Sequence, residues 1–266
     1  MSTAPDVIVH PDKKLLAAAL AARMITVLVD AQAARGSASV VLTGGSTGTA
    51  VLEQLRLSPA RDAVDWSRLD VYWGDERFLP LGDPERNETQ ARTALLDHVP
   101  VDAARVFAMG ASDSPLGDDP DAAAAAYAKT LAEQAGDGVV PRFDLLLLGL
   151  GEEGHVASVF PNSPAVHEHD RTVVAVRDCP KPPPVRISLT LSAVRAAGQV
   201  WVCASGESKA EAVRTGLSGA GEVELPGAGA RGLDRTLWVL DPAAASLLAR
   251  QQLPRRRGAV PPRSVL

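Results

Sequence analysis

The run FDLLLLGLGEEGHVASVFP, residues 143–161, decides the fold class. Its opening residues, 143–148, show no regular alternation of polar and apolar side chains, which is typical of a central strand covered on both faces. Three glycines, Gly149, Gly151 and Gly154, follow at once and allow a tight turn at the carboxyl end of that strand. Open α/β sheets place their ligand sites at this end of their strands. The run therefore predicts the centre of a sheet and, directly after it, a functional loop.

The segments on either side continue the pattern of an α/β protein. Apolar runs rich in β-branched residues alternate with Ala- and Leu-rich segments of helical length, which predicts βαβ units around an open, largely parallel sheet flanked by helices. The expected strands are residues 7–9, 38–42, 69–72, 143–148, 172–176, 185–189, 200–204 and 236–240. The expected helices are residues 13–34, 47–55, 88–98, 121–135, 209–215 and 243–250. Residues 112–119 and 217–232 are rich in Gly, Ser, Asp or Pro and are expected to form surface loops or lids.

Length and composition fit one domain of this class. The chain has 266 residues, of which 46% are hydrophobic and 22% charged, so a disordered or collagen-like chain is excluded. We expect a single α/β domain over residues 1–252 and a Pro- and Arg-rich tail without fixed structure over residues 253–266. The basic run in this tail, residues 255–257, is interpreted as a solvated end.

Net charge, hydropathy and cysteine content limit which partners and cofactors the protein is expected to bind. A net charge of -5 predicts no broad cationic face and disfavours duplex nucleic acid. No run of about 18 uninterrupted apolar residues and no signal-like N-terminus is present, so we expect no membrane partner and a cytoplasmic location. Cys179 and Cys203 are too few for a disulfide framework, and the HEHD run at residues 167–170 lacks further ligands, so no metal is expected.

The predicted strand 38–42 leads into TGGSTG, residues 43–48. Gly44 and Gly45 let the backbone turn tightly and present N–H groups, and the partial positive charge at the next helix N-terminus suits a phosphate. No Lys follows the glycines as it would in a Walker A loop, so a nucleoside triphosphate is disfavoured. On these residues alone, a phosphate cradle and an ordinary capped turn both stay open.

The glycines after the central strand also have the G-x-G-x-x-G spacing of a dinucleotide site. Against that interpretation, Glu152 and Glu153 lie where a pyrophosphate would bind, and Pro161 shortens the next helix too far for a βαβ crossover. The better interpretation is a glycine-shaped loop that presents His155. A His with acidic neighbours can be fixed in one tautomer and kept basic, as a general base near neutral pH requires. A helix-capping His is the alternative.

Three other segments carry charged residues next to predicted strands. LDVYWGDERFLP, residues 69–80, presents Asp75, Glu76 and Arg77 in a loop closed by a proline, and a Pro-rich approach precedes the strand near Arg186. Lys209 falls in the first turn of a predicted helix, where it opposes the helix dipole, a mild cost that makes sense if Lys209 reaches an anion. Each segment also fits an ordinary surface turn or a solvated side chain.

Taken together, these segments resemble the 6-phosphogluconolactonases, in the superfamily that also holds the glucosamine-6-phosphate isomerase/deaminases. The similarity runs from about residue 11 to residue 241. It rests on LTGGST, on W-x-D-E-R with Asn87 ten residues after Arg77, on LGLGEEGHVASVFP, on PKPP followed by Arg186, and on SGESKAEAV. The resemblance implies a Rossmann-like sheet that binds a sugar phosphate without a nucleotide, metal or other cofactor.

The resemblance also implies a reaction, the hydrolysis of 6-phospho-D-glucono-1,5-lactone to 6-phospho-D-gluconate in the oxidative pentose phosphate pathway. His155 would be the general base, with Glu153 orienting it, and Asp75 and Arg77 would complete the catalytic set, Arg77 facing the sugar. The 6-phosphate would be held by Gly44, Gly45, Ser46, Arg186 and Lys209.

Two departures and three alternatives accompany this assignment. Family members usually carry Asp-Gly-His where this chain has Glu153-Gly154-His155, and Pro is common at the position of Gly48. The W-G-D-E-R segment disfavours a glucosamine-6-phosphate isomerase/deaminase. A non-catalytic sugar-phosphate sensor is a second alternative, but a regulator of this kind would be expected to carry an additional DNA-binding segment. A nicotinamide oxidoreductase is the third alternative. A monomer or small homo-oligomer is expected.

Overall fold

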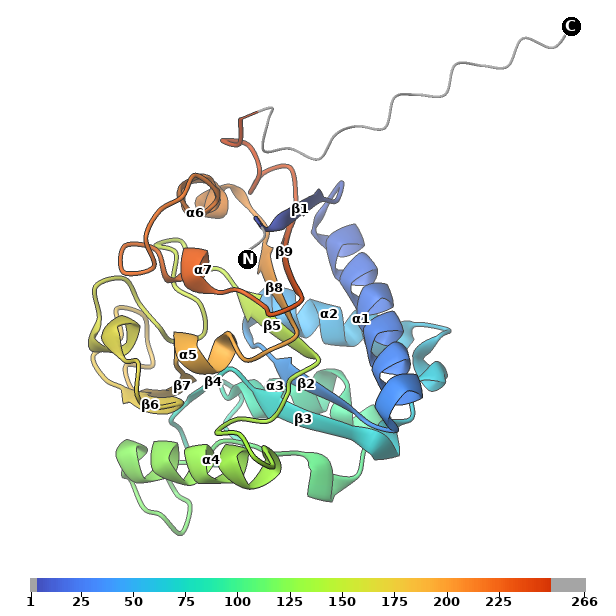
Figure 1. Cartoon of the computed structure of the whole chain (residues 1–266), viewed down its shortest axis with the longest axis vertical. Coiled ribbons are helices and arrows are strands. Elements are labelled where there is room, and N and C mark those ends of the chain that lie inside the picture. Colours follow the sequence, from blue (N-terminus) through green and yellow to red (C-terminus); the bar gives the residue numbers. More distant parts are fainter. Residues whose placement is uncertain (1–3, 250–266) are drawn as a thin grey trace, which may run out of the picture.

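Six strands form one parallel sheet in the order β1-β9-β8-β5-β2-β3 in the computed structural model, which describes residues 4–249 (Figure 1). Every neighbouring pair in this sheet is parallel. The strands are β1 (Asp6–Val9), β2 (Ala38–Leu42), β3 (Leu69–Trp73), β5 (Leu145–Gly149), β8 (Gln199–Ala204) and β9 (Arg235–Leu240). The interior position of β5 confirms that the run at residues 143–148 predicts the sheet centre, although the strand begins two residues later.

A second, smaller sheet is antiparallel and has the order β4-β7-β6. Its strands are β4 (Asp75–Arg77), β6 (Val173–Val176) and β7 (Arg186–Leu189). The prediction that placed residues 172–176 and 185–189 in the parallel sheet, and residues 75–77 in a loop, is therefore wrong. Only residues 177–185 join β6 to β7, without a helix, and this is too short for the crossover that parallel strands need.

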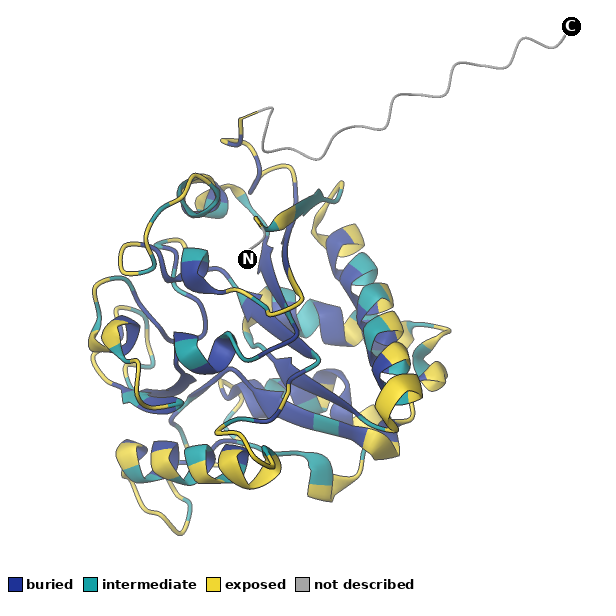
Figure 2. Ribbon diagram, in the orientation of Figure 1, coloured by how far each residue is buried: buried dark blue, intermediate teal, exposed yellow. Residues whose placement is uncertain are grey.

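Helices cover both faces of the parallel sheet (Figure 1). On one face lie α1 (Lys13–Arg35), α2 (Gly45–Leu57) and α3 (Asn87–Ala94); on the other lie α4 (Pro120–Gln134), α5 (Leu191–Val194), α6 (Ala210–Leu217) and α7 (Pro226–Gly229). A hydrophobic core lies on each face of the sheet, and alternate side chains of β5 pack into them. Leu145 and Leu147 face α1, while Leu146 and Leu148 face α4. The interior strands β2 and β5 are buried almost throughout, whereas the edge strand β1 is partly exposed (Figure 2). The open α/β fold predicted from the sequence is confirmed.

The first helix is long and apolar enough to cross a membrane by length and composition. Its apolar residues, among them Leu16, Leu20 and Leu28, are instead buried against the sheet and α2, which accounts for their number. The Asp12 carboxylate accepts the N–H of Leu15 at the start of α1, and Gly36 ends the helix with a φ of 81°.

Other helix predictions need correction. The predicted helix 88–98 ends at Ala94 and continues only as a 3₁₀ turn. The predicted helix 243–250 is absent from the described residues, because the chain forms turns over 242–247 while the Asp241 carboxylate accepts the N–H groups of Gly206 and Ala244. The remaining 3₁₀ turns are Arg61–Ala63, Trp66–Arg68, Ala103–Arg105, Pro164–His167 and Glu207–Lys209. Residue 250 and the predicted tail at 253–266 lie outside the described residues.

The predicted lid at residues 217–232 is partly ordered into α7. Leu225, just before this helix, is buried against the core, so this segment is a packed part of the fold.

Candidate active site

A cavity of about 200 Å³ opens at the carboxyl ends of β2, β5 and β8. In the sheet, the chain moves outward from β2 to β3 on one side and from β5 to β8 on the other, so the loops after β2 and β5 diverge and leave a crevice. Eight of the nine predicted site residues line this cavity. Its lining is residues 43–47, 149–151 and 203–205, with Asp75, Arg77, Asn87, His155, Ala157, Arg186 and Lys209.

The glycine loop after β2 forms one wall. Helix α2 starts at Gly45, two residues earlier than predicted, and no side chain caps its first N–H groups. Gly45 has a φ of 76°, and a Cβ atom on Gly44 would lie 1.8 Å from Oδ1 of Asn87. Both positions thus need glycine, one for its conformation and one for its close contact. The uncapped helix N-terminus faces the cavity, as an anion site requires.

Lys209 comes to the same cavity from the segment after β8. It is the last residue of a 3₁₀ turn and the N-cap residue of α6. The prediction that placed it inside the first turn of the helix is therefore wrong, because Lys209 directly precedes that turn. Burial and the nearby Lys181 ammonium lower the pKa of Lys209, while Glu152 and Glu153 oppose this shift. An anion in the cavity would offset the cost of holding this charge.

His155 lies at the end of the loop that follows β5. Its Nδ1 atom is 3.2 Å from Oε1 of Glu153, and Oε2 of Glu153 is 3.1 Å from Nζ of Lys181. The first contact is not aligned as a hydrogen bond, since Nδ1 has no such partner among residues 4–249. The imidazole also packs on the Phe160 ring, with centroids 4.4 Å apart. The Lys181 ammonium, the Glu153 carboxylate and the His155 imidazole therefore form a chain of contacts, which we call the charge chain.

Burial sets the proton affinity of this imidazole. It lowers the pKa of His155 below 6.5, and the charges of Glu153 and Asp75 only partly offset it. For Glu153, burial raises the pKa, but a backbone hydrogen bond, the neighbouring His155 imidazole and the Lys181 ammonium outweigh burial and lower it overall. At neutral pH the site thus pairs a neutral imidazole with an ionised carboxylate.

Asp75 is fixed by two neighbours. Its Oδ2 accepts the hydroxyl of Ser158 at 2.6 Å, and its Oδ1 accepts Nδ2 of Asn87 at 3.2 Å. The same Nδ2 donates to the Asp75 carbonyl at 2.8 Å. Because both carboxylate oxygens already accept hydrogen bonds, Asp75 presents a fixed negative charge to the cavity rather than a mobile side chain.

The residue after Asp75 points the opposite way, as alternation along β4 requires. Glu76 is 1% exposed and accepts the N–H groups of Arg77, Asn87 and Glu88, which fixes the start of α3. The fully buried Arg86 guanidinium lies 3.7 Å from Glu76 and 3.4 Å from Glu88. This buried cluster supports the wall that carries Asn87, and no local sequence pattern predicts it.

Two arginines face each other across the small sheet, since Arg77 on β4 pairs with Arg186 on β7. Arg77 donates to the Glu85 carbonyl at 2.6 Å. Arg186 donates to the carbonyls of Lys181, Pro182 and Pro183, so much of its guanidinium holds the Pro-rich loop that carries Lys181. Arg186 thus stabilises the loop besides lining the cavity.

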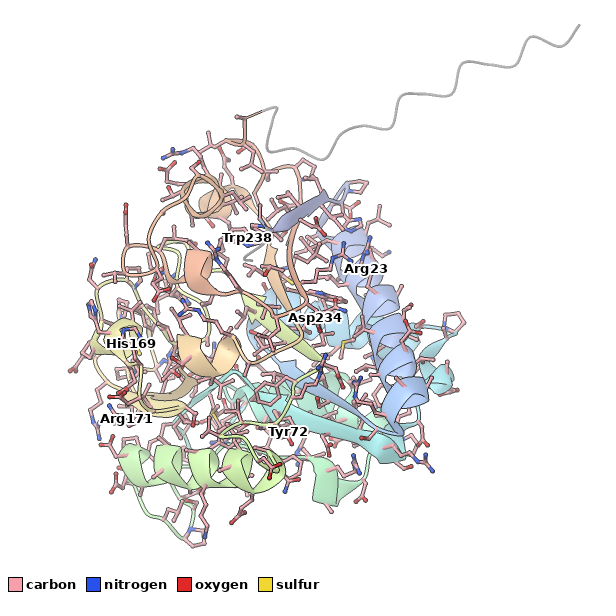
Figure 3. The ribbon with its side chains drawn as sticks, in the orientation of Figure 1. Arg23, Tyr72, His169, Arg171, Asp234 and Trp238 are labelled. Atoms are coloured by element: carbon pink, nitrogen blue, oxygen red, sulfur yellow. The ribbon has the colours of Figure 1, made fainter. Side chains whose placement is uncertain are left out.

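The sequence interpretation missed three contributors to this site. Asn87 was quoted in the motif set without a role, and Ser158 and Lys181 lie in quoted motifs whose contacts appear only in three dimensions. Among the described residues, no group of three or more His, Cys, Asp or Glu side chains could hold a metal ion. His169 of the HEHD run lies at the periphery near Arg171 (Figure 3).

The family model for glucosamine-6-phosphate isomerases/6-phosphogluconolactonase matches residues 11–238. The chain belongs to this family. It is 62% identical over 257 residues to the 6-phosphogluconolactonase of Streptomyces coelicolor, an overlap of 96% of this chain and 98% of that relative. It is 49% identical over 241 residues to the 6-phosphogluconolactonase of Mycobacterium tuberculosis, covering 90% and 97%.

A solved member of the glucosamine-6-phosphate isomerase/6-phosphogluconolactonase family has the same fold. The 6-phosphogluconolactonase of Trypanosoma brucei is 27% identical to this chain, with a TM-score of 0.79 over 94% of this chain and 100% of that one. Family membership confirms the resemblance drawn from the sequence motifs.

Proposed function

We propose that the protein hydrolyses 6-phospho-D-glucono-1,5-lactone to 6-phospho-D-gluconate. The observation that carries this proposal is the composition of one cavity, in which a buried imidazole backed by a carboxylate faces a glycine loop and several cations. The imidazole and its carboxylate suit the activation of water, and the glycine loop and the cations suit the binding of a phosphate. Relatives at 46–62% identity are named 6-phosphogluconolactonases, which favours this activity over sugar-phosphate deamination.

In the proposed reaction, Nε2 of His155 takes a proton from water as the water oxygen bonds to the lactone carbonyl carbon. Burial keeps His155 neutral near pH 7, so the acceptor lone pair is available. The imidazolium that forms is stabilised by Glu153, whose charge Lys181 in turn maintains. The bond from the carbonyl carbon to the ring oxygen then breaks, and the proton passes from His155 to that oxygen as it becomes a hydroxyl.

The cationic part of the cavity would bind and orient the substrate. The N–H groups at the start of α2, Ser46 and Lys209 would hold the phosphate, with Arg186 adding charge at the opposite wall. Arg77 would face the sugar and the negative charge that develops on the carbonyl oxygen. Asp75, held by Ser158 and Asn87, would stabilise the imidazolium from a second side.

A coupled assay tests the proposal. The lactone is generated in situ from glucose 6-phosphate, and 6-phosphogluconate is followed with its dehydrogenase against the spontaneous rate in buffer. We expect a clear acceleration by the wild-type protein, a loss of about 10²-fold or more in His155→Ala, and wild-type activity in His167→Ala, which alters an exposed histidine outside the cavity. A folded His155→Ala protein with near-wild-type turnover would exclude His155 as the base.

The expected cytoplasmic location and monomeric or small homo-oligomeric state stay predictions. Light scattering after size-exclusion chromatography measures the second directly.

A further inference from the structure

Lys13, which the motifs did not single out, reaches the glycine loop from the start of α1. Its Nζ donates to Oγ of Ser46 at 2.9 Å, across 33 residues of sequence. Ser46 lines the cavity, whereas Lys13 does not. The ammonium therefore contacts a residue of the proposed phosphate site from outside the cavity lining.

The placement of this charge is unfavourable by the usual rule for helices. A helix N-terminus favours negative charge, but the first turn of α1 contains Lys13 and Lys14 and no acidic residue, and only the capping Asp12 supplies a carboxylate there. The N-terminus of α2 lies next to that of α1, since Ser46 of α2 accepts the hydrogen bond of Lys13. This second helix N-terminus has no side-chain cap. Between residues 4 and 249, Lys13 forms no salt bridge that would neutralise it. A residue that opposes the local electrostatic preference, with no nearby partner to compensate, is expected mainly at functional sites.

The direction of the hydrogen bond explains what this charge does to Ser46. An ammonium group has only donors, so the hydroxyl oxygen of Ser46 must be the acceptor. The hydroxyl proton of Ser46 is then left to be donated elsewhere, and a donor polarised by a cation binds an anion more strongly.

We propose that Lys13 is a positioning residue of the phosphate site, which orients and polarises the Ser46 hydroxyl for donation to the substrate phosphate. This inference rests on the proposed function, because the phosphate is that of the proposed substrate. Lys13 contacts the phosphate through Ser46, so its contribution is to binding in both the ground state and the transition state.

Kinetics of three variants test the inference. We expect Lys13→Ala to raise KM for the lactone about five- to tenfold with kcat within about twofold, the pattern for loss of uniform binding. Lys13→Arg should restore most of the affinity. Lys14→Ala removes the same charge from the same exposed turn and is the matched control, with KM expected to equal that of the wild type. Equal KM values in Lys13→Ala and Lys14→Ala would overturn the inference.

Direct binding separates this result from the proposed activity. Titration calorimetry with 6-phosphogluconate should show Lys13→Ala weakened by the same factor, and the double variant with Ser46→Ala should be little weaker than Ser46→Ala alone. That outcome supports the role of Lys13 even in a protein that proves inactive on the lactone. Additive losses in the double variant would show that Lys13 does not act through Ser46 and would refute the inference.

Discussion

Replacing Gly151 by Ala should displace the imidazole of His155 without changing that residue. A Cβ atom at position 151 would lie 1.9 Å from Nδ1 and 2.2 Å from Cε1 of His155. An ordinary van der Waals contact is at least 3.4 Å, so the ring has to move by about 1.5 Å. The matched control is Gly221→Ala, at an exposed position outside the cavity where an added Cβ would meet no atom within 4 Å.

The size of the expected effect follows from this displacement. A misplacement of about 1 Å in a reacting group can cost on the order of 10²-fold in rate. The base itself contributes roughly 10²–10⁴-fold, which sets the upper bound. We therefore expect kcat/KM of Gly151→Ala to fall about 100-fold or more, equivalent to about 2.7 kcal/mol of transition-state stabilisation.

The fold should survive the substitution. Gly151 does not have a positive φ, and its backbone N–H and carbonyl, which bond to His155 and Gly154, are unaffected by a methyl group. We expect the melting temperature to stay within about 4 °C of the wild type, the shift for about 1 kcal/mol in a domain of this size. The coupled lactone assay and a thermal melt are run on both variants. A folded Gly151→Ala protein with a kcat/KM within threefold of that of Gly221→Ala would contradict the predicted displacement of the imidazole.

Three further predictions concern the charged groups around the cavity. Lys181→Ala should raise the pKa of His155 and move the acid limb of the pH–kcat/KM profile to higher pH, whereas Glu153→Gln should move it to lower pH; an unmoved limb in both would contradict the charge chain. Above pH 8, where Glu76 is ionised, Arg86→Met leaves this buried carboxylate without its cation and should lower the free energy of unfolding by about 3–5 kcal/mol in urea titrations; a loss under 1 kcal/mol would disprove this cost. Burial raises the pKa of Glu76 from 4.5 to about 7. The stability gained from its neutral form is therefore complete below pH 4.5 and lost as pH rises through 7, a slope that denaturation of Glu76→Gln across this range should no longer show.

The sequence predicts the parts of this molecule that depend on local pattern. An unbroken apolar run identified β5, and glycine-rich turns after β2 and β5 identified the two loops that line the cavity. Strand direction could not be read in the same way, because short apolar runs have the same composition in parallel and antiparallel sheets. For this reason β6 and β7 were assigned to the wrong sheet, whereas β4 was missed because its three charged residues have the composition of a turn.

Contacts between side chains far apart in the sequence could not be predicted either. Lys13 and Ser46 are 33 residues apart, and Lys181 and Glu153 are 28 apart, so no periodicity links them. Glu76 and Arg77 looked alike as charged turn residues, yet alternation along a strand buries one and exposes the other to the cavity. The sequence showed which residue types were present, whereas their partners depended on the tertiary fold.

Gly74 alone separates β3 of the parallel sheet from β4 of the antiparallel sheet, and its backbone bonds to Leu42 and Leu189 join the two. With this spacing Asp75 and Arg77 face the cavity, while Glu76 faces Arg86. One residue inserted or deleted here would reverse every side chain of β4. Natural variation in chain length among relatives should therefore spare this junction and accumulate in surface segments such as residues 112–119, where a peptide tag could also be inserted.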